Sequence, residues 1–142
     1  MSETKTSTQT NERNTAMGLD LYLYTQSKPG AQLGEQLPRV EVAYFRKFNA
    51  LIKWVDTHVQ KVTNCEDIML DQNHLQTLLQ TLEQLTGQNC EHHFPTTEGF
   101  FFGSTQYDAW YWQDVGRLKK VLKKLLRETD FGKSVIYFYA WW

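Results

Sequence analysis

GLDLYLY, residues 18–24, is the stretch that decides the fold. Its leucines, Leu19, Leu21 and Leu23, alternate with polar and aromatic residues, and this period of two predicts a strand with one apolar face. Residues 1–16 are rich in Ser, Thr, Asn, Gln and Glu and lack aromatic or branched aliphatic side chains. Such a segment cannot offset the entropy of ordering, so we expect a disordered tail before a domain over residues 17–142.

Downstream of this strand, apolar residues recur mostly at helical spacing. Apolar positions three and four residues apart predict a helix from Val40 to Val59, and a leucine stripe predicts another that ends at Gly87, with Asp71 as its cap. A third helix is expected over residues 112–127. DIML, residues 67–70, is a second strand or a connector, and SVIYFYAWW, residues 134–142, is typical of a terminal strand. We therefore expect an α+β domain with three helices on a two- or three-stranded antiparallel sheet.

Length and charge narrow the function classes. The chain has 142 residues, enough for one domain, and a formal net charge of -1, which makes a dedicated nucleic-acid binder unlikely. Its apolar runs are shorter than the roughly 20 residues of a membrane span, and its first residues do not resemble a secretory signal. We expect a cytoplasmic protein whose Cys65 and Cys90 are reduced thiols.

The segment GFFFGS, residues 99–104, sits in a region of loop composition that begins at residue 88. It lacks the Gly-Lys-Ser/Thr ending of a P-loop, and three bulky rings would hold a backbone away from a phosphate. Two interpretations remain. The run is a short strand with Phe100 and Phe102 facing the core, or it is a loop that offers rings to a ligand. In both, Phe101 is the ring most available for binding.

An aromatic strip follows at residues 107–112. Tyr107, Trp110, Tyr111 and Trp112 carry O–H and N–H groups that need polar partners, so they cannot all be buried. Some of them should lie at an interface or a pocket rim, where aromatic residues often dominate binding. Ser104 or Thr105 could begin a helical turn just before the strip.

Polar side chains on the helix predicted from Val40 are candidates for an anion site. Arg46, Asn49 and Lys53, followed by Asp56, would lie along one helical row, where a guanidinium offers paired donors to a phosphate or carboxylate. A solvated helix face is the alternative. Glu98 and Asp108 flank the phenylalanine run and could pair with this row or act as general acid and base.

Two further features admit a functional and an ordinary interpretation. Cys65, Cys90, His92 and His93 are zinc-type donors, but they lack the usual paired spacings, so we predict ordinary thiols and exposed histidines, no metal and no cofactor. The helix over residues 112–127 has four lysines on its outer face. They could attract nucleic acid or an acidic partner, but such a face is usually only solvated.

Three stretches together resemble a known family: MGLDLYLY from Met17, EVAYFRKFNALIKWV from Glu41, and PTTEGFFFGSTQYDAWYWQD from Pro95. They are similar to small proteins of bacteriophages and bacterial genomes that open with MGLDMYLY and carry a GFFFGST-Y-D segment, and for which no activity is established. The resemblance runs from residue 17 almost to residue 142. It draws attention to Glu41, Tyr44, Arg46, Asn49, Phe101, Tyr107 and Asp108.

Three functions are consistent with these observations. The resemblance to small phage proteins favours a non-catalytic binder that sequesters a nucleotide-like ligand or inhibits a host defence factor. Its ligand would contact Tyr44, Arg46, Asn49, Lys53, Phe101, Tyr107 and Tyr111. A small hydrolase or transferase acting on a phosphorylated molecule, with Glu98 or Asp108 as general base, is the first alternative. A protein-interaction module that presents the aromatic strip is the second.

Overall fold

The computed structural model describes residues 18–28, 38–99 and 102–142. Within these residues, strands β1 (Asp20–Ser27), β2 (Arg39–Arg46), β3 (Asp67–Leu70) and β4 (Ser134–Trp141) form one antiparallel sheet in the order β2-β1-β4-β3. The first and last described strands are therefore neighbours in its middle, with Asp20 opposite Trp141. The predicted tail over residues 1–16 and the ring of Phe101 lie outside the described residues.

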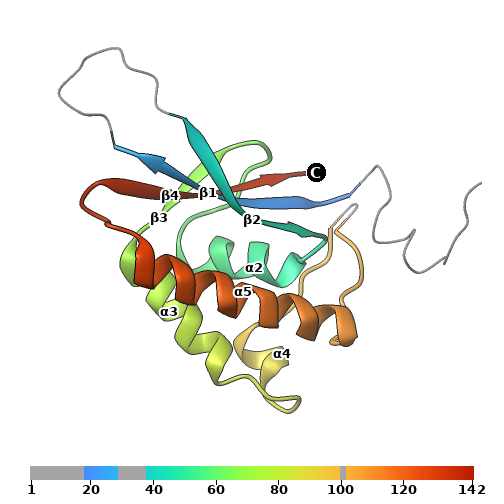
Figure 1. Ribbon diagram of the computed structural model, residues 1–142. Coiled ribbons are helices and arrows are strands. Elements are labelled where there is room, and N and C mark those ends of the chain that lie inside the picture. Colours follow the sequence, from blue (N-terminus) through green and yellow to red (C-terminus); the bar gives the residue numbers. More distant parts are fainter. Residues whose placement is uncertain (1–17, 29–37, 100–101) are drawn as a thin grey trace, which may run out of the picture.

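The described helices gather on one side of the sheet (Figure 1). They are α2 (Asn49–His58), α3 (Gln72–Glu83), the one-turn α4 (Cys90–His93) and the long α5 (Ala109–Glu128), and α3 packs against α5. In this part of the chain no helix is both long and apolar enough to cross a membrane. The arrangement confirms a small α+β domain, in which the described residues form four strands and four helices where the sequence predicts two or three strands and three helices.

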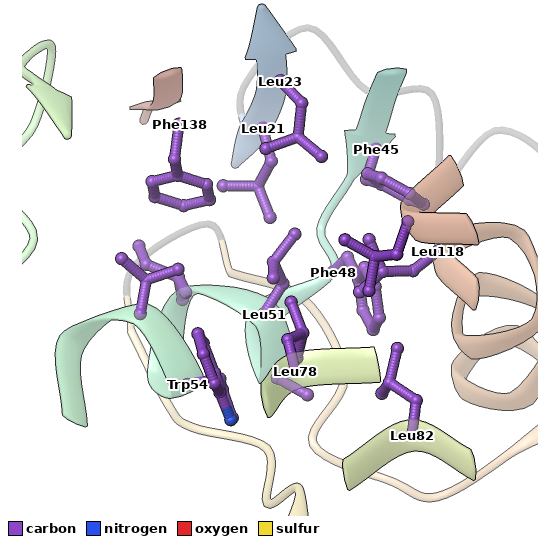
Figure 2. Close-up of a cluster of buried hydrophobic side chains, with 14 of the residues drawn as sticks. Leu21, Leu23, Phe45, Phe48, Leu51, Trp54, Leu78, Leu82, Leu118 and Phe138 are labelled. Carbon is purple, nitrogen blue, oxygen red and sulfur yellow. The ribbon is translucent and has the colours of Figure 1, made fainter. Parts of the chain in front are cut away.

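One apolar core joins the sheet to the helices. Leu21, Leu23 and Phe138 point from β1 and β4 toward Leu51 and Trp54 of α2, as Figure 2 shows. Leucines of α3 and α5 complete the core. Phe45 and Phe48 pack against each other with ring centroids 5.2 Å apart. Burial of this continuous apolar surface is the main force that holds the helices to the sheet.

Side-chain caps fix where two of the helices begin. Asp71 accepts a hydrogen bond from the backbone N–H of His74, and the His74 side chain bonds back to the Asp71 amide, so the predicted cap of α3 is confirmed. Asp108 does the same for α5 by accepting from the amide of Tyr111 at 3.1 Å. Helix α5 thus begins at Ala109, three residues before the predicted start, and neither Ser104 nor Thr105 caps it.

The helix predicted from Val40 to Val59 is wrong in its first half. Residues 39–46 form strand β2, in which Val40 and Val42 are β-branched and favour extended backbone. Lys47 then takes a φ of 59°, a conformation that no continuous helix permits, and α2 begins only at Asn49. Arg46, at the end of β2, therefore does not share a helical row with Asn49 and Lys53.

The phenylalanine segment also differs from the short strand that was one of its two interpretations, as far as it is described. Gly99 and residues 102–105 lie in irregular loop, so the described part of GFFFGS is not a strand. Phe102 is half-buried and meets Trp142 edge to face, with centroids 5.4 Å apart. Its ring lies against the C-terminal end of β4, where Asn64 holds the backbone of Trp142 through two hydrogen bonds.

Candidate ligand pocket

A pocket of about 480 Å³ lies where the β2–α2 connection, the loop after α4 and the start of α5 meet. Volumes of this order accommodate small organic ligands. The β2–α2 connection contributes Lys47 and Asn49, the loop contributes Ser104 and Gln106, and α5 contributes Trp110 and Asp114. The pocket is therefore built from three segments that lie far apart in the sequence.

Asn49 fixes the loop that forms one wall of this pocket. It is 2% exposed, and its side-chain amide donates to the carbonyls of Phe102 and Ser104 at 3.1 and 2.9 Å. Its Oδ1 accepts the backbone N–H of Thr97 at 3.0 Å. Because one buried amide satisfies three backbone groups on both arms of the loop, Asn49 acts as a positioning residue here.

Lys47 and Gly103 meet at the pocket wall with unusual backbone conformations. Lys47 has a φ of 59° and Gly103 a φ of 86°, both in the left-handed region. A methyl group built on Gly103 would lie 3.0 Å from the side-chain carbons of Lys47. Such conformations need support from their surroundings and are common at binding sites. The glycine lets the lysine stem lie against the loop, and Lys47 is one of the residues that line the pocket.

The start of α5 gives the pocket both aromatic and polar groups. Trp110 is 38% exposed although it is large and apolar, which places it at the rim as the aromatic strip predicts. The first N–H groups of a helix have no intrahelical acceptor and carry partial positive charge. Asp114, only 2% exposed, binds Arg117 at 3.3 Å, and Arg117 also donates to the carbonyl of Tyr44.

The two tyrosines of the strip have structural partners. The Tyr111 hydroxyl donates to the carbonyl of Phe94 at 2.7 Å, and burial raises the pKa of Tyr111 far above its ordinary value. The Tyr107 hydroxyl accepts the amide of Thr96 at 3.2 Å, and its ring meets Tyr111 edge to face. Both side chains brace the loop, and Tyr111 also lines the pocket.

Tyr44 and Arg46 lie away from the pocket. Both side chains bond Oδ1 of Asp20, Arg46 through Nη1 at 2.8 Å and Tyr44 through its hydroxyl. Burial is the largest cause that raises the pKa of Tyr44. Nε and Nη2 of Arg46 are buried without a hydrogen-bond partner in the described structure. Neither residue lines the pocket, because β2 turns these side chains toward the sheet face opposite the helices.

The remaining predicted site residues are dispersed. Lys53 lines a smaller pocket of about 200 Å³ with Asp56, Phe102 and Trp142. Glu98 is exposed and does not line the larger pocket, whereas Asp108 lines it while capping α5. Of the predicted site residues, the structure brings Asn49, Tyr107, Asp108 and Tyr111 into one region. Arg46, Lys53 and Glu98 lie elsewhere.

The candidate zinc donors are also dispersed. Cys65 is exposed, Cys90 is buried, and both are free thiols. His92 and His93 are exposed on α4, with their rings edge to face. Across residues 18–28, 38–99 and 102–142, no three His, Cys, Asp or Glu side chains are grouped as metal ligands.

Lys47, Gln106 and Asp114 are pocket residues that the sequence did not single out. Nothing in the sequence indicates Lys47, because the positive φ of this lysine cannot be predicted from the neighbouring residues. Asp114 falls on the buried side of α5 among apolar residues, and such a carboxylate at a core position was the one available indication.

Comparisons of the chain with protein-family models, with curated proteins and with solved structures found no match. What the pocket binds is therefore inferred from its own chemistry.

Proposed function

We propose that the protein is a binding protein that sequesters a nucleotide-like ligand in the pocket between Lys47 and the start of α5. The observation that carries this proposal is the pocket itself, about 480 Å³ in volume, with a cationic side chain on one wall and an exposed indole on the other. A phosphate fits the positive charge of a lysine, and a base fits the face of Trp110.

Polar groups between these two walls suit the edge of a nucleobase. Gln106 and Ser104 offer donors and acceptors from the loop. A few placed polar groups in an otherwise apolar pocket set the orientation of a ligand. The resemblance to small phage proteins fits a sequestering role in conflict between phage and host.

We favour binding over catalysis because neither candidate carboxylate is placed to act as a general base. Asp108 is engaged with the amide of Tyr111, and Glu98 is exposed outside the pocket. A general base must reach the proton that it removes, and no second predicted acid or base faces Asp108 across the pocket. A hydrolase or transferase remains the alternative that a turnover assay tests.

The first experiment is native mass spectrometry of the gently purified chain, followed by calorimetric titration with adenosine, adenosine 5′-monophosphate and guanosine 5′-monophosphate. Lys47→Gln should weaken monophosphate binding by about tenfold or more and leave adenosine unchanged, because it removes one charge-assisted contact. Trp110→Ala should weaken all three ligands. Trp141→Ala, which removes the exposed tryptophan of β4, is the matched control and should bind as the wild type. The proposal would be refuted if the wild type showed no measurable binding. It would also be refuted if both pocket variants bound the ligands as tightly as the wild type.

A further inference from the structure

The sheet face opposite the helices is rich in tyrosine. Because side chains alternate along a strand, residues next to the buried Leu21, Leu23 and Phe138 point away from the core. Five of them form what we term the tyrosine face: Tyr22, Tyr24, Tyr44, Tyr137 and Tyr139. None of the described helices covers this face (Figure 1).

The rings of the tyrosine face are already assembled. Tyr22 stacks on Tyr24 with centroids 5.6 Å apart and planes 13° apart, and it also meets Tyr44 at 5.1 Å and Tyr139 at 6.3 Å. Rings that support each other lose little freedom when a partner covers them. Preassembled aromatic side chains are the usual anchors of protein interfaces.

Two large apolar side chains extend this face. Met69 of β3 lies opposite Tyr137 and is 57% exposed, and Trp141 of β4 lies opposite Asp20 and is 54% exposed. Both stand on the same side of the sheet as the tyrosines. Tyrosine, tryptophan, methionine and arginine are the residues enriched at the centre of protein interfaces. The composition therefore points to a protein partner.

Four charged residues of the face are paired within it, and a fifth, Glu41 opposite Tyr24, is exposed. Arg39 of β2 reaches across the sheet to Asp67 of β3 with two hydrogen bonds of 2.9 and 3.0 Å. Its guanidinium lies 5.3 Å from the Tyr24 centroid and 4.7 Å from the Tyr137 centroid. Arg46 is paired with Asp20. Because both cations are already neutralised by carboxylates, the face offers little attraction to a phosphate backbone. This disfavours single-stranded nucleic acid as the partner that covers it.

A second copy of the chain fits such a surface. Two identical faces can pack about a twofold axis only if they do not bring unpaired like charges together. Internal pairing leaves Glu41, on the edge strand β2, as the one charged residue of the described face that the axis must keep away from its copy. The helix side is less suitable, because α5 carries Lys120 and Lys124 in exposed positions beside the Lys123–Glu83 ion pair. Two copies in contact there would repel each other.

The size of the face suits a modest dimer. The sheet has four described strands of up to eight residues. At about 4.8 Å between strands and about 3.4 Å per residue, the footprint is roughly 450 Å². Pairing two such faces would remove on the order of 1,000 Å² from water, near the lower limit of specific interfaces.

We propose that the protein forms a twofold dimer in which two tyrosine faces pack sheet on sheet. The dimer leaves both ligand pockets outside the contact, because none of the residues that line a pocket belongs to the tyrosine face. It depends on the outer residues Trp141 and Met69 at the margins and on the tyrosines at the centre. An interface of this size predicts an equilibrium between monomer and dimer that shifts with concentration.

Sedimentation velocity of the full chain over a wide concentration range tests the dimer. The wild type should shift from monomer to dimer as concentration rises. Trp141→Lys and Met69→Lys should each weaken dimerisation by about tenfold or more, because each buries an unpaired charge in the contact. Val40→Lys is the matched control, since Val40 is also 54% exposed but pairs with Thr25 on the other side of the sheet. It should dimerise as the wild type does.

Circular dichroism of each variant confirms that it is folded before its mass is interpreted. A wild-type chain that stays monomeric at all concentrations would overturn the proposal. A dimer that survives both lysine substitutions would overturn it as well, because it would use another surface. Retention of a labelled single-stranded oligonucleotide by a wild-type monomer would assign the face to stacked bases instead.

Discussion

Asn49 shows how one buried amide can determine the shape of a site. It occupies the first position of α2, where a side chain is close both to the sheet and to the loop around residue 100. Its three hydrogen bonds reach Thr97, Phe102 and Ser104, which are the residues that hold the two arms of that loop together. Loss of this amide would leave buried backbone groups without partners.

We predict that Asn49→Ala lowers the free energy of unfolding by about 2–4 kcal/mol, because it removes several buried hydrogen bonds at once. Urea denaturation monitored by tryptophan fluorescence measures the loss. Asn89→Ala is the matched control. Asn89 also bonds backbone groups, those of Gln84 and Thr86, but these bonds are exposed to solvent, so water can replace them. Equal losses in the two variants would contradict the positioning role of Asn49.

Tyr111 makes stability depend on alkaline pH. Burial raises its pKa in the folded chain above the ordinary value of 10.0, so the folded state prefers the neutral phenol. The stability that this preference gives is complete below about pH 10 and is lost as the pH rises above that value. We predict that Tyr111→Phe is about 1 kcal/mol less stable at pH 7, since it loses the bond to Phe94.

The difference between the two proteins should then shrink above pH 10, where only the wild type must ionise a buried phenol. Urea midpoints measured from pH 7 to pH 11 test this. All other tyrosines are common to both chains, so their effects cancel in the comparison. Parallel pH profiles would show that ionisation of Tyr111 does not contribute.

At the scale of elements, α5 supplies both a wall of the core and a wall of the pocket. Its N-terminal turn lines the pocket, while Leu118, Leu122 and Leu125 face the sheet and α3. Asp108 fixes where the helix begins, and therefore where Trp110 stands at the rim. A change in this cap would alter both helix stability and the pocket.

We predict that Asp108→Ala costs about 1 kcal/mol of stability, whereas Asp108→Asn costs less than about 0.5 kcal/mol, because asparagine is an equally good N-cap. Thermal and urea unfolding measure both. The same pair of substitutions at Asp71 of α3 is the control, since that cap lies far from the pocket wall in the sequence and serves a helix that does not line it. If Asn and Ala were equally harmful at residue 108, the carboxylate charge would matter beyond capping.

Elements with a clean single period were predictable from the sequence. The alternation in residues 18–24, the leucine stripe of α3 and the β-branched run of β4 each carry one dominant signal. Residues 40–59 carry two competing signals. Tyr44, Phe48 and Leu51 fit a helical stripe, whereas the side chains of β2 alternate between the two faces of the sheet. The break between them depends on the positive φ of Lys47, which sterics disfavour and only the packed fold stabilises.

The candidate site was less predictable than the fold, for the same reason. Asn49 and the aromatic strip were identified by residue type, but the direction of a side chain depends on its element. Arg46 was predicted to lie on a helix but lies on strand β2. Its side chain therefore points to the face of the sheet opposite the helices, where it pairs with Asp20. Trp110, by contrast, stayed within a helix and reached the expected rim.

At the scale of the whole molecule, the described residues form one continuous core. Among them, the buried apolar side chains run from Leu19 to Ala140. We predict that a chain beginning at Met17 unfolds within about 2 °C of the full chain, because it loses no large apolar side chain. Differential scanning calorimetry at equal protein concentration measures both midpoints.

Removal of residues 134–142 is the opposite case and serves as the control. It deletes β4, which pairs with both β1 and β3, and should abolish cooperative unfolding altogether. A truncation at Met17 that also lost the transition would show that the first segment contributes to the fold.

The position of β4 between β1 and β3 also has a consequence for synthesis. β1 is among the first described elements to leave the ribosome, and β4 leaves after all the others. Until then β1 and β3 each present an open hydrogen-bonding edge and an uncovered apolar face, the features that lead nascent chains to aggregate. The four-stranded sheet can form only after β4 has been synthesised, so β1 and β3 keep these exposed edges until the end of translation.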